Sequence, residues 1–107
     1  RVTDENAHVT ILNKEHILFK EPNKITEIDF NDWVQERGLY FANSWDKRYE
    51  ALFSMSDKGE SEKKGSLLVA DCGKGKFIFT GLSFFRQLPS GVPGAYRLFL
   101  NLISYGQ

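Results

Sequence analysis

The chain has little cysteine and no excess of either charge. Cys72 is the only cysteine among its 107 residues, so an internal disulfide and a metal cluster held by several cysteines are both excluded. Fourteen basic side chains are balanced by fourteen acidic ones. Without a net charge there is no long-range field to draw the chain to nucleic acid or to an anionic membrane, and we expect neither as a partner. Any binding must rely on local contacts.

The sequence also lacks an apolar run long enough to span a membrane and a secretion signal at its start. It begins at Arg1 rather than at a methionine, which favours a piece of a larger multidomain protein. A missing signal therefore says nothing of the parent protein, which would be periplasmic or extracellular if it is exported. A single cysteine leaves the compartment open as well. The localisation is not predicted.

What the chain does have is enough apolar material for a core. Hydrophobic residues make up 41% of it and nine residues are phenylalanine, which is typical of a globular protein and argues against disorder of the whole chain. At this length we expect one domain, residues 1–107, that buries a core with little stability to spare.

The clearest local pattern predicts a β-hairpin near residues 66–80. Two apolar runs, 66–71 and 76–80, flank the short link 72–75, which contains two glycines. The link resembles a phosphate-binding loop only superficially, because a strand rather than a helix follows it. Since both runs are nearly continuous in apolar residues, we expect both faces of the sheet to be covered by helices.

A helix is predicted after Pro93, which suits a first helical turn, and Gly106 lies where the helix should stop. Its apolar positions follow the helical spacing: Ala95, Leu98, Phe99, Leu102 and Ile103. We therefore predict an α/β domain with a small, mostly buried β-sheet and a C-terminal helix packed on that sheet.

The other elements are predicted from shorter patterns. We expect strands at 9–12 and 49–55, a turn or short helix at 16–19, and a polar loop at 56–65 to which no function is assigned. Thr26 has the position of a helix N-cap, with a short helix after it that ends at Gly38. Residues 33–37 could equally belong to a strand with 39–41, and that boundary stays open.

No catalytic or metal site emerges from the titratable residues. Cys72 has no histidine nearby to activate it and is interpreted as a packing residue. His8 and His16 have no ligand spacing, so no metal and no cofactor are predicted.

A carboxylate pair for acid and base chemistry could form on the predicted helix from Asp29, Asp32 and Glu36. A solvated helix face on which Arg37 is the partner of these carboxylates is the favoured interpretation, because charged helix faces are usual on soluble proteins.

The sharpest binding hypothesis rests on aromatic residues between 33 and 49 that alternate with hydrogen-bonding side chains. Exposed rings with such neighbours could stack on sugars, although a buried core is the favoured interpretation for most of these rings. Arg86 follows two phenylalanines at a strand end, where α/β sheets often form clefts. The candidate ligand-binding residues are Trp33, Glu36, Arg37, Tyr40, Trp45 and Arg86.

Three strings resemble a known family. Residues 32–41 (DWVQERGLYF), 73–89 (GKGKFIFTGLSFFRQLP) and 91–98 (GVPGAYRL) are similar to the C-terminal portion of bacterial PIG-L (LmbE-like) deacetylase family proteins. In that family a zinc-dependent N-acetylglucosamine-type deacetylase domain precedes a region that resembles the class I glutamine amidotransferase or ThuA-like (flavodoxin-like) fold. The resemblance covers nearly the whole chain.

The resemblance implies a supporting role rather than catalysis. The family's zinc motif is absent from these residues, and Cys72 lies in a predicted hairpin instead of the strand-turn-helix of an amidotransferase nucleophile. We therefore expect a non-catalytic accessory domain, structural or glycan-binding. Its expected partners are carbohydrate, the other domains of the parent chain, or a second copy paired through an exposed sheet edge. The alternative is a fragment of an amidotransferase-like enzyme whose active site lies upstream.

Overall fold

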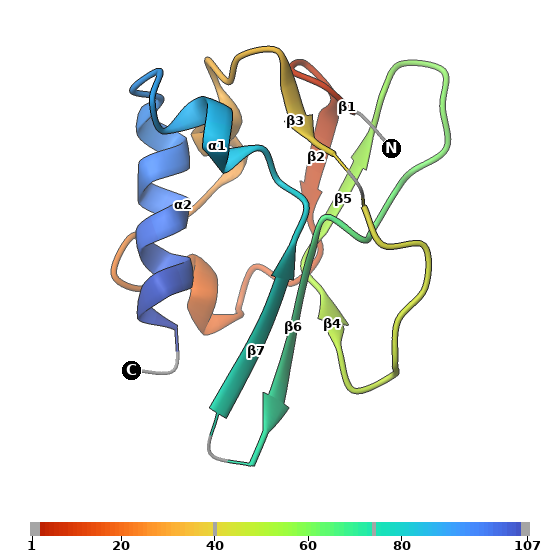
Figure 1. The fold of residues 1–107 in the computed structure, drawn as a ribbon, viewed down its shortest axis with the longest axis vertical. Helices are drawn as coiled ribbons and strands as arrows, with labels where there is room; N and C mark the ends of the chain where they lie inside the picture. The colour runs from red at the N-terminus through yellow and green to blue at the C-terminus, as the bar shows by residue number, and fades with distance from the viewer. Residues whose placement is uncertain (1–2, 40, 74, 106–107) are drawn as a thin grey trace.

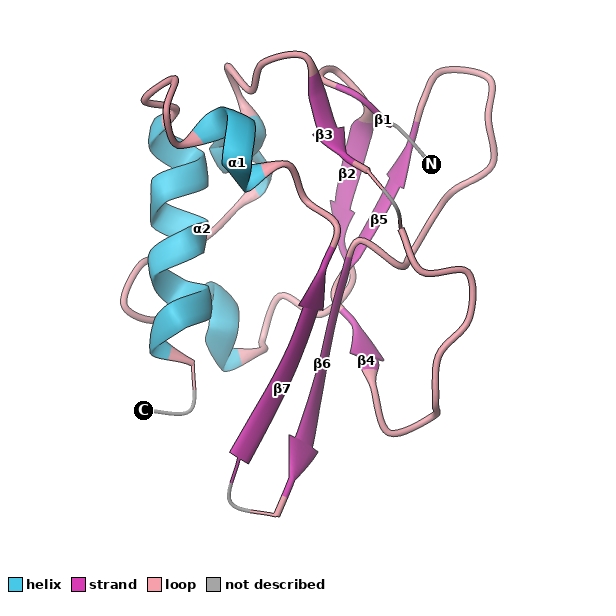
Figure 2. Cartoon of the chain, viewed as in Figure 1, coloured by secondary structure: helices cyan, strands magenta, loops and turns pink. Residues whose placement is uncertain are grey.

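The computed structural model describes residues 3–39, 41–73 and 75–105. They form a small α/β domain in which the helices gather on one side and the strands on the other (Figures 1 and 2). In chain order the elements are β1 (Thr3–Asp4), β2 (His8–Ile11), η1 (Ile17–Phe19), η2 (Glu27–Phe30), β3 (Glu36–Gly38), β4 (Glu50–Ala51), β5 (Phe53–Ser56), β6 (Leu67–Cys72), β7 (Gly75–Thr80), α1 (Phe84–Gln87) and α2 (Pro93–Ser104), where η marks a 3-10 helix.

The described strands form three antiparallel sheets. In two of them β1 pairs with β3 and β2 pairs with β5, and in the third β6 lies between β4 and β7. The predicted hairpin is confirmed: β6 and β7 pair from Leu67 opposite Thr80 to Cys72 opposite Gly75. Gly73 begins the turn at φ 57°, which glycine adopts without strain. The strand predicted at 49–55 is two short strands, because β4 and β5 pair with different partners on either side of Leu52.

One apolar core joins the two sides of the domain. Phe53 on β5 lies edge to face with Phe30 on η2, with ring centroids 5.1 Å apart. Leu98 and Leu102 on α2 belong to the same cluster as Leu67 on β6. The predicted C-terminal helix is confirmed, with Pro93 in its first turn, and its main neighbours are η1, η2 and α1. It meets the strands through this shared core, while Gly106 lies outside the described residues.

The prediction that both faces of the hairpin are covered is wrong for β7. Ile78 packs against the core, but Phe77 and Phe79, which point to the other face, are 54% and 40% exposed. The described helices lie together on one side of the strands, so they cover one face only (Figure 2). The continuous apolar run of β7 therefore places Ile78 against the core and Phe77 and Phe79 on an exposed face.

The predicted helix after Thr26 is one 3-10 turn that ends at Phe30. Its start is confirmed, because Thr26 accepts the N–H of Ile28 and donates its own N–H to Asp29 in a capping box. The chain then leaves helical geometry, with φ of 67° at Asp32 and 62° at Gln35. Within the stretch whose boundary is open, only residues 36–38 form a strand, β3, which pairs with β1; residues 33–35, 39 and 41 lie in neither a helix nor a strand.

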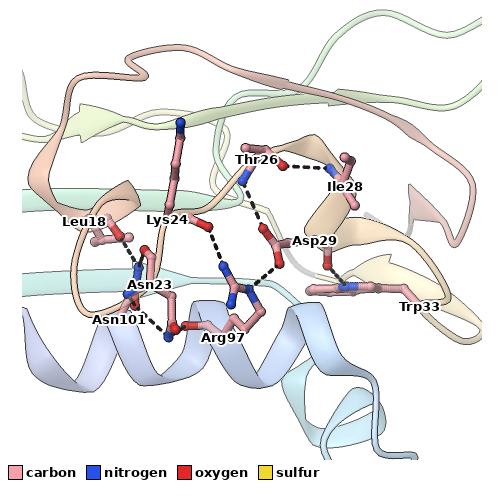
Figure 3. Close-up of polar contacts among 9 residues, drawn as sticks. All are labelled: Leu18, Asn23, Lys24, Thr26, Ile28, Asp29, Trp33, Arg97 and Asn101. Carbon is pink, nitrogen blue, oxygen red and sulfur yellow. Dashed lines mark hydrogen bonds and ion pairs between the residues drawn. The ribbon is translucent and has the colours of Figure 1, made fainter.

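Residues 18–29 are mostly irregular and are held on α2 by polar side chains (Figure 3). The fully buried Asn101 donates to the carbonyls of Leu18 and Asn23, each at 2.7 Å, and accepts the N–H of Asn23 at 3.0 Å. Arg97 pairs with Asp29 at 2.8 Å and donates to the Lys24 carbonyl at 2.6 Å. These bonds replace those that a regular helix would provide.

Candidate functional site

Trp33 is a core residue rather than part of an exposed platform. Only 3% of it is exposed, and its ring packs between Phe30 and Phe84 with centroids 4.8 and 5.9 Å away. Its indole N–H donates to the Asp29 carbonyl at 2.9 Å. No face of this ring is available to stack on a ligand.

Arg37 is also buried, and its partners are backbone carbonyls rather than the carboxylates expected on a helix. Its guanidinium donates to the carbonyls of Ala7 and Phe30, both at 2.7 Å, and lies 5.3 Å from the centroid of the Phe30 ring. Burial lowers the pKa of Arg37 to about 10, so the group remains charged at neutral pH. Arg37 ties β3 to the β1–β2 connection and to η2.

Glu36 and Arg86, predicted together as ligand-binding residues, do meet. Their side chains form an ion pair at 2.8 Å in which Glu36 is buried and Arg86 is half-buried. The Glu36 carbonyl accepts from Ser83 at 2.6 Å and from Gln87 at 3.0 Å, which joins β3 to α1. These bonds give the buried polar groups of β3 and α1 their hydrogen-bond partners, so the cluster holds the two elements together.

The expected carboxylate pair does not form an exposed acidic site. Asp29 is occupied by the Thr26 cap and by Arg97, while Asp32 is exposed. His16 accepts the N–H of Leu18 through Nδ1 and caps η1, and His8 is exposed. Within the described residues no group of three potential ligands could hold a metal ion. The interpretation of Cys72 as a packing residue concerns a side chain outside those that are described.

Trp45 is the one tryptophan with an accessible ring, 37% exposed, while Tyr40 lies outside the described residues. It lines a hollow of about 300 Å³ between residues 41–45 and the end of the 56–65 loop. We call this hollow the Trp45 cleft; it is lined by Phe41, Ala42, Asn43, Trp45, Ser61, Glu62, Lys63 and Lys64. The structure thus separates Trp45 from the other predicted site residues and gives it new neighbours.

Backbone hydrogen bonds fix the two walls of the Trp45 cleft. The N–H of Ala42 donates to the Gly65 carbonyl at 3.1 Å, and Met55 and Lys63 exchange two bonds of 2.8 and 2.7 Å. A Cβ at Gly65 would lie 2.0 Å from the Ala42 carbonyl oxygen, so only glycine permits this close approach. The cleft is therefore built by the fold and does not depend on a free loop.

The chemistry of the cleft combines one ring with hydrogen-bonding groups of several kinds. Asn43 offers an amide, Glu62 a carboxylate and Lys64 an ammonium group, all on exposed side chains. Lys63 is less available, because its ammonium group donates to the Ser61 carbonyl at 3.1 Å and pairs with Glu60 at 3.3 Å. An apolar face with polar groups around it is the general composition of small-molecule sites.

Comparisons with known proteins add no relative. No protein-family model matches the chain, and the searches of curated proteins and of solved structures find no match either. None of the helices in the described ranges is long and apolar enough to cross a membrane.

Proposed function

We propose that the chain is a non-catalytic accessory domain of a carbohydrate-processing protein and that it binds carbohydrate in the Trp45 cleft. The observation that carries the proposal is the exposed Trp45 ring in a hollow whose other walls carry Asn43, Ser61, Glu62 and Lys64. The C–H face of a sugar ring stacks on such an indole, while its hydroxyls bind amides, carboxylates and ammonium groups.

The resemblance of residues 32–41, 73–89 and 91–98 to PIG-L family proteins supports the carbohydrate class. We propose further that the chain corresponds to the C-terminal part of the amidotransferase-like region of such a protein. The order of hairpin, α1 and α2 supports this assignment. All described strand pairs are antiparallel, so the parallel strands of a flavodoxin-like sheet would come from other parts of the parent.

The structural part of the role rests on a different surface. Phe77, Phe79 and Phe85 expose 54%, 40% and 60% of their surface. Phe79 and Phe85 border a hollow of about 300 Å³ with Leu39 and Leu82. Clustered exposed phenylalanines mark interaction surfaces, and we propose that the other domains of the parent chain cover this one.

The test of carbohydrate binding is a fluorescence titration with glucosamine, N-acetylglucosamine and their oligomers. Because Trp33 is buried, we expect a saturable change that comes from Trp45 alone. The change should vanish in Trp45→Ala and persist in Phe85→Ala, which removes an exposed ring outside the cleft.

A second measurement separates loss of binding from loss of the reporter. Isothermal titration of Asn43→Ala, which keeps both tryptophans, should show binding weakened by about fivefold, the cost of one hydrogen bond of about 1 kcal/mol. Binding that is unchanged in both Trp45→Ala and Asn43→Ala would refute the cleft as the site. No heat or fluorescence change with any sugar in the panel would refute carbohydrate as the ligand class.

A further inference from the structure

A hollow larger than the Trp45 cleft lies apart from it. It has a volume of about 590 Å³ and opens between the end of β2 and residues 14–27. Its apolar floor consists of Ile11, Phe19 and Ile25, each of which is at most 5% exposed. A volume of this size suits a small organic molecule. We call it the basic groove because of the side chains at its rim.

Three lysines line the rim of the basic groove: Lys14, Lys20 and Lys24. Lys20 is neutralised by Glu15 at 2.9 Å, and Lys20 holds the pKa of that carboxyl below its ordinary value, so the pair stays ionised at neutral pH. Among the described residues the ammonium groups of Lys14 and Lys24 form no ion pair at contact distance, although the charge of Lys24 also helps to lower the pKa of Glu15.

The acidic residue Glu27 also borders the groove, where its carboxylate accepts the N–H of Ile11 at 3.4 Å. Three lysines against two glutamates leave the rim with a net charge of +1. The rim therefore favours an anion over a cation, and two ammonium groups are available to contact it.

The wall that carries Lys24 is held firmly in place. The Lys24 carbonyl is bound by Arg97 at 2.6 Å, and the Ile25 N–H donates to the Phe19 carbonyl at 2.7 Å. Asn101 fixes Asn23 on the same segment, and the Lys24 side chain extends away from α2 (Figure 3). A fixed wall reduces the conformational entropy that a ligand would cost on binding.

We propose that the basic groove binds a small organic anion, whose apolar body lies on Ile11, Phe19 and Ile25 and whose phosphate or carboxylate is held by Lys14 and Lys24. The floor residues are already almost fully buried, so affinity comes from burial of the ligand's own apolar surface, and the two lysines provide the selection for negative charge. This site is separate from the Trp45 cleft, so the proposal for the basic groove does not depend on carbohydrate binding.

The test uses phenyl phosphate and phenylacetate as probes, followed by chemical shifts of the backbone amides of the whole chain. Both probes should shift the amides of Ile11, Phe19 and Ile25 in a saturable way. Benzyl alcohol, which lacks the charge, and inorganic phosphate, which lacks the apolar body, should each bind more weakly than phenyl phosphate. Comparing the two organic anions shows whether a phosphate or a carboxylate is preferred.

Matched variants test the two lysines. The double change Lys14→Gln and Lys24→Gln should weaken phenyl phosphate binding about fivefold, since each exposed ionic contact contributes about 0.5 kcal/mol. The control, Lys47→Gln with Lys58→Gln, makes the same change in net charge at exposed positions outside the groove and should leave affinity nearly unchanged. Equal weakening by both pairs would overturn the proposal, as would probe-induced shifts that centre on Phe77 and Phe79.

Discussion

Trp33 and Trp45 are the same side chain in two environments. The first packs between Phe30 and Phe84 with its N–H bonded to a carbonyl, and the second is exposed in a cleft. The sequence places both among the candidate ligand-binding residues, because both lie in one aromatic-rich segment. Which ring is buried depends on strands and loops far along the chain, so the pattern of residues 33–49, which favours a core for most of its rings, does not indicate which ring stays exposed.

We expect the two tryptophans to differ sharply in their contribution to folding. Trp33→Ala should lower the free energy of unfolding by about 3 to 5 kcal/mol, because it leaves a cavity in the core. Trp45→Ala should change it by less than about 0.5 kcal/mol, as is usual for exposed positions. Urea denaturation followed by circular dichroism measures both, and similar losses would contradict the assignment of Trp45 to the surface.

Asn101 provides a second test at this scale. Asn101→Leu keeps the approximate size of the side chain but leaves the carbonyls of Leu18 and Asn23 and the N–H of Asn23 without their partner. We expect the free energy of unfolding to fall by about 3 kcal/mol, because unsatisfied buried polar groups are costly. Leu100→Ala on the exposed side of α2 is the control, and urea denaturation of both variants gives the comparison.

The residues around Trp45 show what the sequence could indicate at the site. Trp45 itself was among the predicted ligand-binding residues. Ser61, Glu62 and Lys64 belong to a polar loop with no recognisable motif, and they line the same hollow as Trp45 because Ala42 bonds to Gly65 and Met55 to Lys63. Those contacts are tertiary, so no local pattern could have found them.

At the scale of elements, the predictions confirmed are those that local chemistry decides. The hairpin near 66–80 has its glycine link, and α2 has both its proline start and its apolar spacing. The segment after Thr26 begins as a helical turn, as predicted. Residues 36–38, however, pair with β1, and the Arg37 side chain is buried and bonded to the Ala7 carbonyl. Long-range pairing overrides the local helical pattern there.

The packing of α2 against η2 at Gly94 makes a further prediction. A Cβ at Gly94 of α2 would lie 1.7 Å from the carbonyl oxygen of Asp29 in η2. Gly94→Ala should therefore lower the free energy of unfolding by about 1 to 3 kcal/mol through overpacking, although alanine favours a helix. Ser104→Ala, at the exposed end of α2, is the control. A thermal melt in which Gly94→Ala is more stable than the parent would contradict this packing of α2.

At the scale of the whole molecule, helices cover the strands of the domain on one side only. The described helices cover one face of the β6–β7 hairpin, while Phe77 and Phe79 remain exposed on the other. Among the described strands β7 is also the last in its sheet and pairs with β6 alone. An edge strand with apolar side chains is a template for pairing with another chain.

We therefore expect the isolated chain to self-associate as its concentration rises. Phe77→Lys with Phe79→Lys should reduce this association, because charges on an edge strand oppose pairing. Leu100→Lys with Ile103→Lys makes the same change on the exposed face of α2 and is the control. Sedimentation equilibrium over a wide range of concentrations measures both, and equal association by all three proteins would exclude this surface as the contact.

The Asn101 network has a consequence for the synthesis of the protein. Its partners Leu18 and Asn23 precede it by 83 and 78 residues, so their hydrogen bonds form only after that length of chain has been synthesised. Contacts between residues so distant in sequence form slowly, because a long loop must close first. During synthesis residues 18–25 are therefore made well before α2, and they lack these partners until Asn101 has been added to the chain.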